Sequence, residues 1–324
     1  MFFTYIGDPH CTLSTIDDCQ KMVDFVFDIC QKTKSTALFA GDLYDHHAII
    51  NSEVQYFWWS TFDKFQKGNI PVIVLNGNHD KPGTLGSPAT ALVAHVSQGR
   101  MVLNEPYVEG KLLFCPYTTP EQLVEWSNQH PECNTIFTHA SFDGAQFQDG
   151  FYDPHGVNPD LIKQNQIISG HVHKSQSFGK VWFPGSPRWL TLNDANQDKS
   201  IYLLEFNDEG ILINKTPYDT GTVCKKIYHF IDTPDNPVSF TPIPNVDYRV
   251  DIRGPESWLK ERLPLFEGIA KVRRIRTGSK MNVVVKESEG VNVAFNKWVD
   301  KYVPKNGTPK EELKELVKER NVGF

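Results

Sequence analysis

The sequence predicts a layered α/β domain followed by a smaller α+β domain. Short apolar runs that end in glycine or polar residues recur through the first two thirds of the chain, amphipathic helical patterns lie between them, and the character changes after Asp219. Strands that alternate with helices are typical of layered α/β domains. With 324 residues, 40% hydrophobic and 22% charged, the chain is long enough for both domains.

The predicted strands of the first domain are short apolar runs of the kind that form buried strands. They cover residues 2–6, 37–40, 70–75, 135–138 and 167–169. From residue 183 to about 216 the pattern is rich in strands, including 201–206 and 211–215, and lacks long helices. This stretch is expected to form a second sheet that completes the domain.

Three helices are predicted between these strands. The first covers residues 16–33, with Ser14 or Thr15 as its cap and acidic residues in its first turn. The second covers residues 51–65. Its apolar face consists of Val54, Phe57, Trp58, Thr61, Phe62 and Phe65. The third is expected to begin at Ser87-Pro88, because proline suits the first turn of a helix.

Residues 220–303 are predicted to form the smaller α+β domain, after a first domain of residues 1–219. Its strands are expected at 226–231, 248–252, 271–276 and 282–285, around a helix near 257–262. Residues 304–324 contain a helix start, in which Thr308 caps, Pro309 follows and Glu311 completes a capping box. The helix should run to about residue 320. Its narrow apolar stripe, formed by Leu313, Leu316 and Val317, suits docking on the protein's own body or on a partner helix.

Charge and cysteine usage narrow the function classes. The formal charge of −6 gives the whole chain no attraction to nucleic acid, so contact with a polyanion would need a local basic patch or bound metal ions. The six cysteines show no C-x-x-C spacing and are expected to be reduced core residues. We find neither a signal-peptide pattern nor an apolar run of about 18 residues, and expect a cytoplasmic protein.

Five polar motifs follow the five apolar runs. They are Gly7-Asp8-Pro9-His10, Gly41-Asp42-Leu43-Tyr44-Asp45, Gly77-Asn78-His79-Asp80, Thr138-His139 and Gly170-His171-Val172-His173. Side chains beyond the carboxyl ends of strands in an open α/β sheet converge on one crevice. Glycine before four of the motifs allows a sharp exit from the strand. Each motif alone is usually a turn, whereas five in order indicate a site.

The donor atoms of these motifs are oxygen and imidazole nitrogen, without thiolate. This set favours manganese, iron, magnesium or zinc over copper(I) or an iron–sulfur cluster. Asp42 is the natural bridge between two ions about 4 Å apart, since a carboxylate has two oxygens. Two divalent ions, two carboxylates and a bridging hydroxide leave a net charge of roughly +1, which suits a phosphodiester.

His79 is the candidate proton donor for the leaving alkoxide, because its neighbour Asn78 is a candidate ligand. Asp45 is expected to orient His79 and favour its protonated form, with Asp80 as a weaker candidate for a supporting role. The histidines outside the motifs are interpreted as ordinary residues. They are His46, His47, His95, His130, His155 and His229.

The order D-x-H, G-D-x-x-D, G-N-H-D, H, G-H-x-H across roughly residues 1–220 resembles the calcineurin-like metallophosphoesterases. The resemblance implies a four-layer α/β/β/α sandwich with two divalent metal ions, and it implies His79 as the catalytic acid. One metal would be held by Asp8, His10, Asp42 and His173, and the other by Asp42, Asn78, His139 and His171. Within this superfamily, protein Ser/Thr phosphatases carry an arginine after the second motif and glutamate where Asp80 stands, so that activity is disfavoured.

The stretch Phe183-Pro184-Gly185-Ser186-Pro187-Arg188, the second domain and the terminal helix are similar to SbcD-type double-strand-break-repair nuclease subunits, including compact phage relatives. This likeness implies a manganese-dependent DNA nuclease that degrades duplex ends 3′ to 5′ and cuts single strands. It further implies a homodimer that acts with an SbcC-like, SMC-family coiled-coil ATPase, in the host cytoplasm if phage-encoded. Many cellular relatives have histidine where Asp45 stands.

Two surface features fit such partners, and each has a plainer interpretation. Tyr56 and Trp59 lie off the apolar face of the second helix, as a dimer contact or as an ordinary exposed pair. The dense basic cluster consists of Lys271, Arg273, Arg274, Arg276 and Lys280. It either contacts the DNA backbone or forms a solvated strand face.

Two other functions stay open. A phosphodiesterase for cyclic nucleotides or other small phosphodiesters would use the same fold, although it would not need the second domain and its tail. An inactive scaffold would keep the fold and bind partners, although the intact ligands and His79 argue against it.

Overall fold

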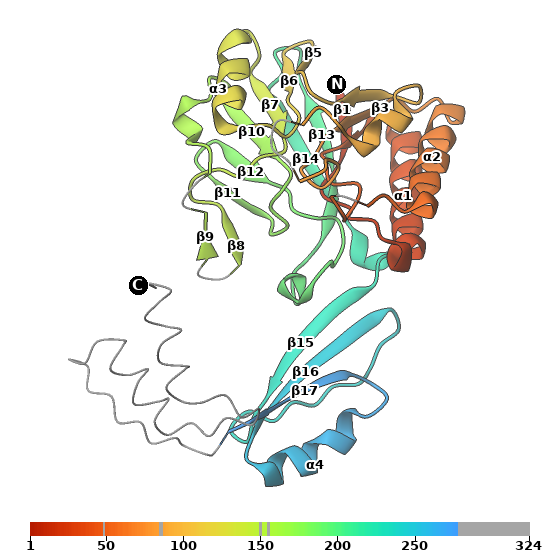
Figure 1. The fold of residues 1–324 in the computed structure, drawn as a ribbon, viewed down its shortest axis with the longest axis vertical. Helices are drawn as coiled ribbons and strands as arrows, with labels where there is room; N and C mark the ends of the chain where they lie inside the picture. The colour runs from red at the N-terminus through yellow and green to blue at the C-terminus, as the bar shows by residue number, and fades with distance from the viewer. Residues whose placement is uncertain (48, 84–86, 149–150, 154–155, 278–324) are drawn as a thin grey trace, which may run out of the picture. The chain divides into compact units, whose positions relative to one another are not determined.

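The structure is a computed structural model that describes residues 1–47, 49–83, 87–148, 151–153 and 156–277. Figure 1 shows the arrangement of its elements. The chain divides into two compact units, one of Met1–His229 with Thr241–Arg249, the other of Phe230–Phe240 with Val250–Phe324. The predicted strand at 282–285, Lys280 and the predicted tail helix lie outside the described residues.

The first sheet has six strands. In spatial order they are β14 (Leu212–Asp219), β13 (Ser200–Phe206), β1 (Phe2–Ile6), β2 (Thr36–Phe39), β3 (Val72–Leu75) and β4 (Arg100–Val102). Strands β1 to β4 are parallel, and β13 and β14 add an antiparallel hairpin beside β1. The expectation that this hairpin belongs to a second sheet is wrong. The free edge of β1 offers hydrogen bonds to β13, and Leu204 and Phe206 fill the space between the sheets.

The second sheet is built from the middle of the chain. Its order is β11 (Gln176–Phe178), β12 (Val181–Phe183), β10 (Gln166–Ser169), β7 (Thr135–Thr138), β6 (Leu112–Phe114) and β5 (Tyr107–Glu109). The four central strands are parallel, and both edge strands are antiparallel. A small hairpin, β8 (Gln146–Gln148) and β9 (Phe151–Tyr152), stands apart from this sheet.

The two sheets pack face to face through aromatic side chains. Phe3 of the first sheet lies 5.9 Å from Phe114 and 6.0 Å from Phe137 of the second, measured between ring centroids. These three side chains belong to one buried apolar cluster that draws residues from both sheets. This packing places the ends of the parallel strands of both sheets around the same region.

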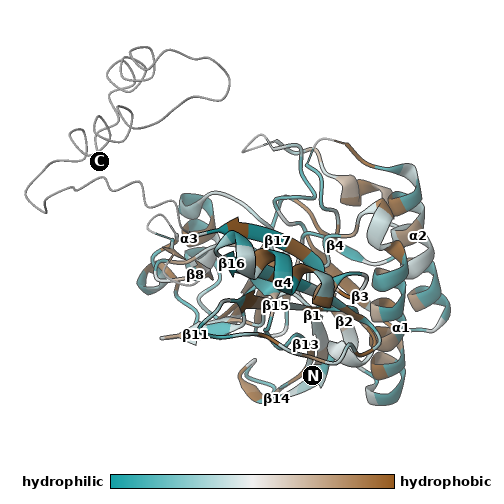
Figure 2. Ribbon diagram, turned by 90° about the horizontal axis from the view of Figure 1, so that it is seen from below, coloured by the Kyte–Doolittle hydropathy of each residue, from teal (hydrophilic) through white to brown (hydrophobic). Residues whose placement is uncertain are grey.

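Helices cover the outer faces of the sheets. The helices α1 (Ile16–Thr33) and α2 (Ser52–Lys67) pack on the first sheet, and α3 (Pro120–Gln129) packs on the second. The buried face of α2 is the predicted one, and hydrophilic and hydrophobic residues alternate along α1 and α2 in Figure 2. The four-layer α/β/β/α sandwich is therefore confirmed.

The predicted third helix at Ser87-Pro88 is wrong. The described residues from Ser87 to Thr90 have no helical structure, and only a short 3-10 turn, η2 (Ala91–His95), follows. Thr90 caps this turn by accepting from the Leu92 amide, and its hydroxyl also donates to Asn76. Four further 3-10 turns are η1 (Leu13–Thr15), η3 (Pro159–Leu161), η4 (Leu192–Asp194) and η5 (Thr220–Thr222).

All six cysteines are buried and free, as predicted. None of the helices in the described part of the chain combines the length and hydrophobicity that crossing a bilayer requires.

The described residues of the second unit contribute to a three-stranded sheet and contain one helix. The sheet consists of β15 (Lys226–Asp232), β16 (Val246–Gly254) and β17 (Lys271–Arg276), with α4 (Glu256–Phe266) before its last strand. Its apolar cluster contains Val250, Ile252, Leu259 and Phe266. The division between the two units falls within β15 and β16. Three of the four strands expected here and the expected helix are found, and the fourth strand, at 282–285, lies outside the described residues.

Candidate active site

The candidate ligands all stand just beyond the ends of parallel strands. Asp8 and His10 follow β1, Asp42 follows β2 and Asn78 follows β3 in the first sheet. His139 follows β7, and His171 and His173 follow β10, in the second sheet. The tertiary fold brings all seven together. Six of them belong to three groups that share members, and within each group the ligand atoms lie within 4.8 Å of one another. The seventh, Asn78, lies within hydrogen-bond distance of His139 and His171.

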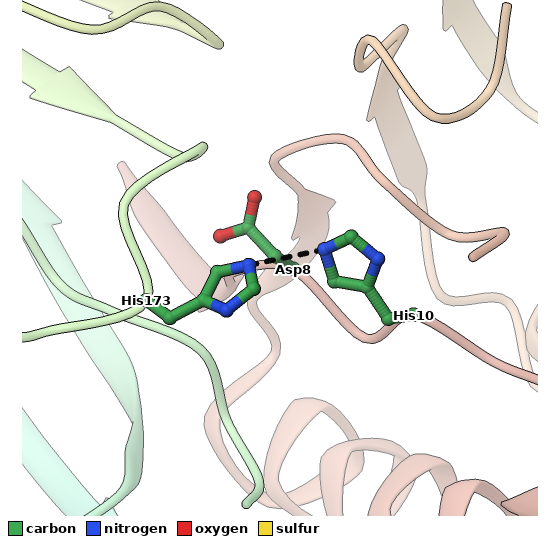
Figure 3. Close-up of side chains that lie close together, drawn as sticks. All are labelled: Asp8, His10 and His173. Carbon is green, nitrogen blue, oxygen red and sulfur yellow. Dashed lines mark hydrogen bonds between the residues drawn. The ribbon is translucent and has the colours of Figure 1, made fainter. Parts of the chain in front are cut away.

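Asp8, His10 and His173 form the first group. The Nε2 atoms of His10 and His173 lie 3.1 Å apart, and Figure 3 shows both rings beside the Asp8 carboxylate. The Oδ2 atom of Asp8 is buried and has no hydrogen-bond partner in the described part of the chain. A buried carboxylate oxygen without a donor is costly. A cation held among these three side chains would remove that cost, so the residues fit a metal ion.

Asp42, His139 and His171 form the second group, and Asn78 lies beside it. The Nδ1 atom of His139 lies 2.8 Å from the Ala40 carbonyl oxygen, which can only accept, so Nδ1 donates. The Nε2 atom of the neutral ring then carries a lone pair. It faces the Asn78 Oδ1 at 3.0 Å and the Asp42 Oδ2 at 3.2 Å. Acceptors that face one another in this way suit a cation between them.

Asp42 lies between the two groups. Its Oδ2 atom is 3.5 Å from the His10 Nε2 and 3.2 Å from the His139 Nε2. Its Oδ1 atom accepts a hydrogen bond of 2.8 Å from the backbone amide of His79. One carboxylate therefore faces ligands from both groups, as a bridging residue must.

The backbone of the site is strained at the ligands themselves. His10, Asp42 and His171 have positive φ angles of 45°, 53° and 78°. Such conformations cost on the order of 1–3 kcal/mol each and persist where the surroundings fix them, typically at functional sites. Gly77 is needed for close approach, since a Cβ there would lie 2.1 Å from the Asp42 Oδ1. Among the glycines before the motifs, Gly41 alone has a positive φ, of 107°. Most of the sharp backbone turns therefore lie at the ligand residues.

The charges of the site favour a cation. Burial lowers the pKa of His171 to about 4, so this imidazole is neutral near pH 7, as a metal ligand must be. Burial also lowers the pKa of His139, but the negative charges of Asp42 and Asp8 outweigh it and raise that pKa to about 9. The site therefore stabilises positive charge, whether it is carried by a proton or a metal ion.

His79 lies next to Asp42 and donates its backbone amide to the Oδ1 atom of that carboxylate. Its Nδ1 lies 2.6 Å from the backbone carbonyl oxygen of Asp45 and donates to it, which leaves Nε2 for the substrate. The Asp45 carboxylate instead lies 3.3 Å from the His10 Nδ1. Our expectation named the wrong atom of Asp45, because its carbonyl orients His79 and its carboxylate faces a ligand. Burial lowers the pKa of His79, which Asp42 and the Asp45 carbonyl oppose only in part, so the expected bias toward the protonated ring is absent.

Asp80 supports two of the ligand loops. Its buried carboxylate accepts hydrogen bonds from the backbone amides of Asp42 and Gly77 at 2.9 Å and of Tyr44 at 3.2 Å. Burial and the charge of Asp42 raise the pKa of Asp80 to about 7, while the amide donors act in the opposite direction. Asp80 therefore fixes the backbone of the second motif against that of the third.

Sequence reasoning missed three aromatic residues beside the ligands. The His47 ring stacks on His79 at 4.0 Å, and its Nδ1 donates to the Asn78 carbonyl oxygen at 2.9 Å. Tyr117 lies 6.4 Å and Phe147 lies 5.9 Å from the His171 ring. No motif marks Tyr117 or Phe147, and the only signal for His47 was its position just after the second motif. The other histidines that lie outside the five motifs belong to no metal-ligand group among the described residues.

The site opens into cavities of the first unit. One of about 330 Å³ is lined by Asp42, His79, Phe147, His171, His173, Lys174, Thr191, Asn193, Asp194 and Gln197. Another, of about 400 Å³, borders Asn78 and His47 and is walled by Tyr117 and Trp126. A third, of about 800 Å³ and largely apolar, extends from His47 past Ile49 toward Leu13. The substrate therefore has room beside His79 and beside its stacking neighbour His47.

The predicted basic cluster lies on β17 of the second unit, with Lys280 outside the described residues. Arg273 donates from Nε to the Asp251 carboxylate at 2.8 Å, and Arg276 lies 3.8 Å from Glu256. Arg274 is exposed and has no ion-pair partner among the residues that the structure describes. Much of the cluster's charge is therefore matched by nearby carboxylates.

Residues 1–175 match the family model described as calcineurin-like phosphoesterase. The chain belongs to this family. Calcineurin-like phosphoesterases are metal-dependent phosphoester hydrolases, and the donor set fits divalent cations. When bound there, such cations would polarise phosphoryl oxygens and lower the pKa of a water molecule. The described site thus has the donor set that the metal-dependent chemistry of this family requires.

Two solved structures are similar to this calcineurin-like phosphoesterase. A 5′-nucleotidase precursor from Thermus thermophilus is 13% identical, with a TM-score of 0.37, and the match covers 68% of this chain and 54% of that one. A hypothetical protein from the same organism is 11% identical, with a TM-score of 0.38, covering 68% of this chain and 98% of that one. The chain thus spans about half the length of the nucleotidase precursor. A comparison with curated proteins finds no match.

Proposed function

We propose that the protein is the nuclease subunit of an SbcCD-like DNA repair or recombination complex. It hydrolyses DNA phosphodiesters with manganese, as a 3′ to 5′ exonuclease on duplex ends and an endonuclease on single strands. The observation that carries the proposal is the buried double cluster around Asp42, with His79 beside it. Two divalent ions, the carboxylates of Asp8 and Asp42 and one hydroxide would have a net charge of roughly +1, which complements the single negative charge of a phosphodiester.

His79 serves as the proton donor in this proposal. Because its Nδ1 donates to the Asp45 carbonyl, its Nε2 is the atom that can deliver a proton to the leaving oxygen. The His47 ring stacks on the His79 ring, with 4.0 Å between their centroids. The departing 3′ or 5′ oxygen of a nucleotide is a poor leaving group, so a fixed proton donor is more useful here than with an activated ester.

The cavities around the site favour a polymeric substrate over a compact one. The spaces of about 330, 400 and 800 Å³ adjoin His79 or its neighbour His47. A strand that crosses the site can place nucleosides on both sides of the scissile phosphate. The alternative, a phosphodiesterase for cyclic nucleotides or other small diesters, is favoured by the 400 Å³ cavity, whose aromatic wall suits a single nucleoside.

The partners belong to the same proposal. Tyr56 and Trp59 on α2 stack at 6.0 Å and are 68% and 44% exposed, which suits the contact of a homodimer. The ATPase would bind through the predicted tail helix. Deletion of residues 306–324 should then abolish co-purification with the coiled-coil ATPase, and retained binding would exclude that role for the tail. In this role the protein would work in the cytoplasm.

One set of assays tests the proposal. Linear duplex DNA, single-stranded DNA and bis-p-nitrophenyl phosphate are incubated with manganese and either the wild-type protein or His79→Ala. We expect the wild type to degrade both DNA substrates and the variant to lose most of this activity. Hydrolysis of the small diester with both DNA substrates intact would overturn the nuclease assignment and favour the small-substrate phosphodiesterase. No hydrolysis of any substrate with manganese would favour the inactive scaffold.

A further inference from the structure

Two buried cations lie behind the ligand loops of the site. Arg188 is 3% exposed and Lys199 is 2% exposed, and no other lysine or arginine in the described residues is buried. A buried charge is costly unless it is paired and hydrogen-bonded, so the partners of these two side chains show what they stabilise.

Arg188 holds the loop that carries Asp8 and His10. Its Nε donates to the Pro9 carbonyl oxygen at 2.7 Å and its Nη2 to the His10 carbonyl oxygen at 2.5 Å. The nearest carboxylate recorded for it, that of Asp18, is 4.0 Å away. The rigid fork of a guanidinium matches two successive carbonyls in a way that a lysine cannot. Two side-chain hydrogen bonds of Arg188 are therefore directed at one ligand loop, and a third goes from Nη2 to the Thr15 hydroxyl at 3.3 Å.

Lys199 holds the loop that carries His171 and His173. Its Nζ donates to the His173 carbonyl oxygen at 2.8 Å and to the Ser186 hydroxyl at 3.0 Å, and it pairs with Asp194 at 2.6 Å. Asp194 in turn accepts from the Thr191 amide and hydroxyl, at 2.9 and 3.2 Å. Asp194 and Thr191 line the cavity at the site, so Lys199 also ties the cavity wall to the ligand loop.

Ser186 connects the two cations. Its backbone amide donates to the His173 carbonyl oxygen at 3.1 Å, and its hydroxyl donates to the Arg188 carbonyl oxygen at 3.0 Å. The backbones are also in close contact, because a Cβ on Gly7 would lie 2.2 Å from the Gly185 carbonyl oxygen. Residues 184–199 therefore form one hydrogen-bonded brace, which joins the loop after β1 to the loop after β10.

This brace supports the two groups of ligands unequally. Asp8, His10 and His173, which form the first group, lie on loops that the brace holds from behind. In the second group, His171 lies on the loop that Lys199 holds, and its backbone amide donates to the Asp8 Oδ1 at 2.7 Å. The other side chains are held elsewhere: His139 is oriented by the Ala40 carbonyl, and Asn78 by its own loop and His47. Arg188 and Lys199 bond to neither of those residues in the described part of the chain.

We propose that Arg188 and Lys199 are positioning residues that hold His10 and His173 at the separation one divalent ion requires. Their support acts directly on the metal held by Asp8, His10 and His173. The metal held by Asp42, Asn78, His139 and His171 has only His171 on a braced loop, so it depends on the two side chains less. The effect is geometric. Positive charges near a bound metal ion would by themselves weaken its binding. For Lys199 this repulsion is offset by its ion pair with Asp194. The inference rests on the metal-dependent chemistry of the family and not on DNA as the substrate.

The test counts metal ions. Arg188→Met and Lys199→Met are titrated with Mn²⁺ in equilibrium dialysis, and the electron paramagnetic resonance spectrum is searched for the spin-coupled Mn²⁺ pair. Loss of a group that orients metal ligands typically weakens affinity by about 10- to 100-fold, so we expect one Mn²⁺ to be weakened by that factor and the other to change much less. The coupled signal should be replaced by that of isolated Mn²⁺.

A matched control is Lys180→Met. Lys180 also donates to a backbone carbonyl, that of Ile162 at 2.5 Å, but in a loop without candidate ligands. This variant should bind two Mn²⁺ ions with unchanged affinity. Arg188→Lys keeps the buried charge, loses the fork, and should weaken the same metal by a smaller factor. It replaces Arg188→Met if that variant does not fold, and Ser186→Ala replaces Lys199→Met in the same way.

Three outcomes would overturn the proposal. Two Mn²⁺ ions bound as tightly as in the wild type would show that the cations do not position the ligands. Equal weakening of both ions would show a general structural role without selectivity. Tighter binding in the methionine variants would show that repulsion between charges outweighs the geometric support. Failure of the nuclease proposal would instead appear as intact metal binding without cleavage of DNA.

Discussion

The buried carboxylates of the site differ from a buried carboxylate of the second unit in the side chains that face them. In the first unit Asp8 and Asp42 are fully or almost fully buried, and the basic side chains that face them are the imidazoles of the site. In the second unit the buried Asp232 is paired with Arg262, whose Nε and Nη2 donate to it at 2.9 to 3.2 Å. A buried carboxylate with its own arginine is a structural pair, and one faced by imidazoles marks a place for a cation.

The largest effect is expected for a substitution of Asp42, the carboxylate that both ligand groups share. Asp42→Asn keeps the shape of the side chain and removes the charge that both ligand groups share, so both metals should be lost. Since each metal supplies several kcal/mol of transition-state stabilisation, hydrolysis should fall by at least about 10⁴-fold. Chelation of the wild-type protein should have the same effect and should be reversed by added Mn²⁺. Near-normal rates of bis-p-nitrophenyl phosphate hydrolysis in the variant would contradict the bridging role.

Removal of a partner from the structural pair should act on stability and leave the metals in place. Arg262→Met leaves Asp232 buried without its partner, which typically costs about 3–5 kcal/mol. Denaturant unfolding of the full chain measures this change. Lys64→Met is the matched control, because its pair with Asp24 is exposed and should contribute only about 0–1 kcal/mol. Equal effects of the two variants would show that burial does not distinguish them.

A substitution of His79 separates metal binding from catalysis in the first unit. His79 lies beside the candidate metal ligands and is not required to hold a metal. His79→Ala should keep two Mn²⁺ ions and slow DNA cleavage by on the order of 100-fold, since a positioned proton donor contributes at least that much. The loss should be much smaller for bis-p-nitrophenyl phosphate, whose leaving group departs without a proton. A similar loss with both substrates would remove His79 as the acid.

The smallest expected effects concern β17. If the second unit binds the DNA backbone, Arg274→Gln should reduce the slope of log affinity against log salt concentration by about 0.9, the loss of one phosphate contact. Arg273→Gln should change it less, because its charge is already matched by Asp251. Filter binding at several salt concentrations measures both slopes. Unchanged slopes in both variants would leave β17 as a solvated strand face.

Most of the site could be predicted from sequence, because its residues follow strands in short motifs. Asp8, His10, Asp42, Asn78, His139, His171 and His173 were found in this way and lie together in the structure. The donor type of each residue and its place after an apolar run were sufficient. The same reasoning found α1 and α2, whose apolar faces are encoded locally. It failed at Ser87-Pro88, because a proline that suits a helix start does not supply the apolar face that would hold the helix.

What the sequence by itself determined was the chemistry of the site: which donors there are, that they suit divalent metals, and that the fold is a layered α/β sandwich. Only the tertiary structure decided which atom of each residue acts, because this depends on directions in space. It turned the Asp45 carboxylate toward His10 and its carbonyl toward His79, placed His47 against His79, and moved the β13–β14 hairpin to the first sheet. It also buried Arg188 and Lys199 behind the ligand loops, 178 and 26 residues along the chain from the carbonyls that they hold.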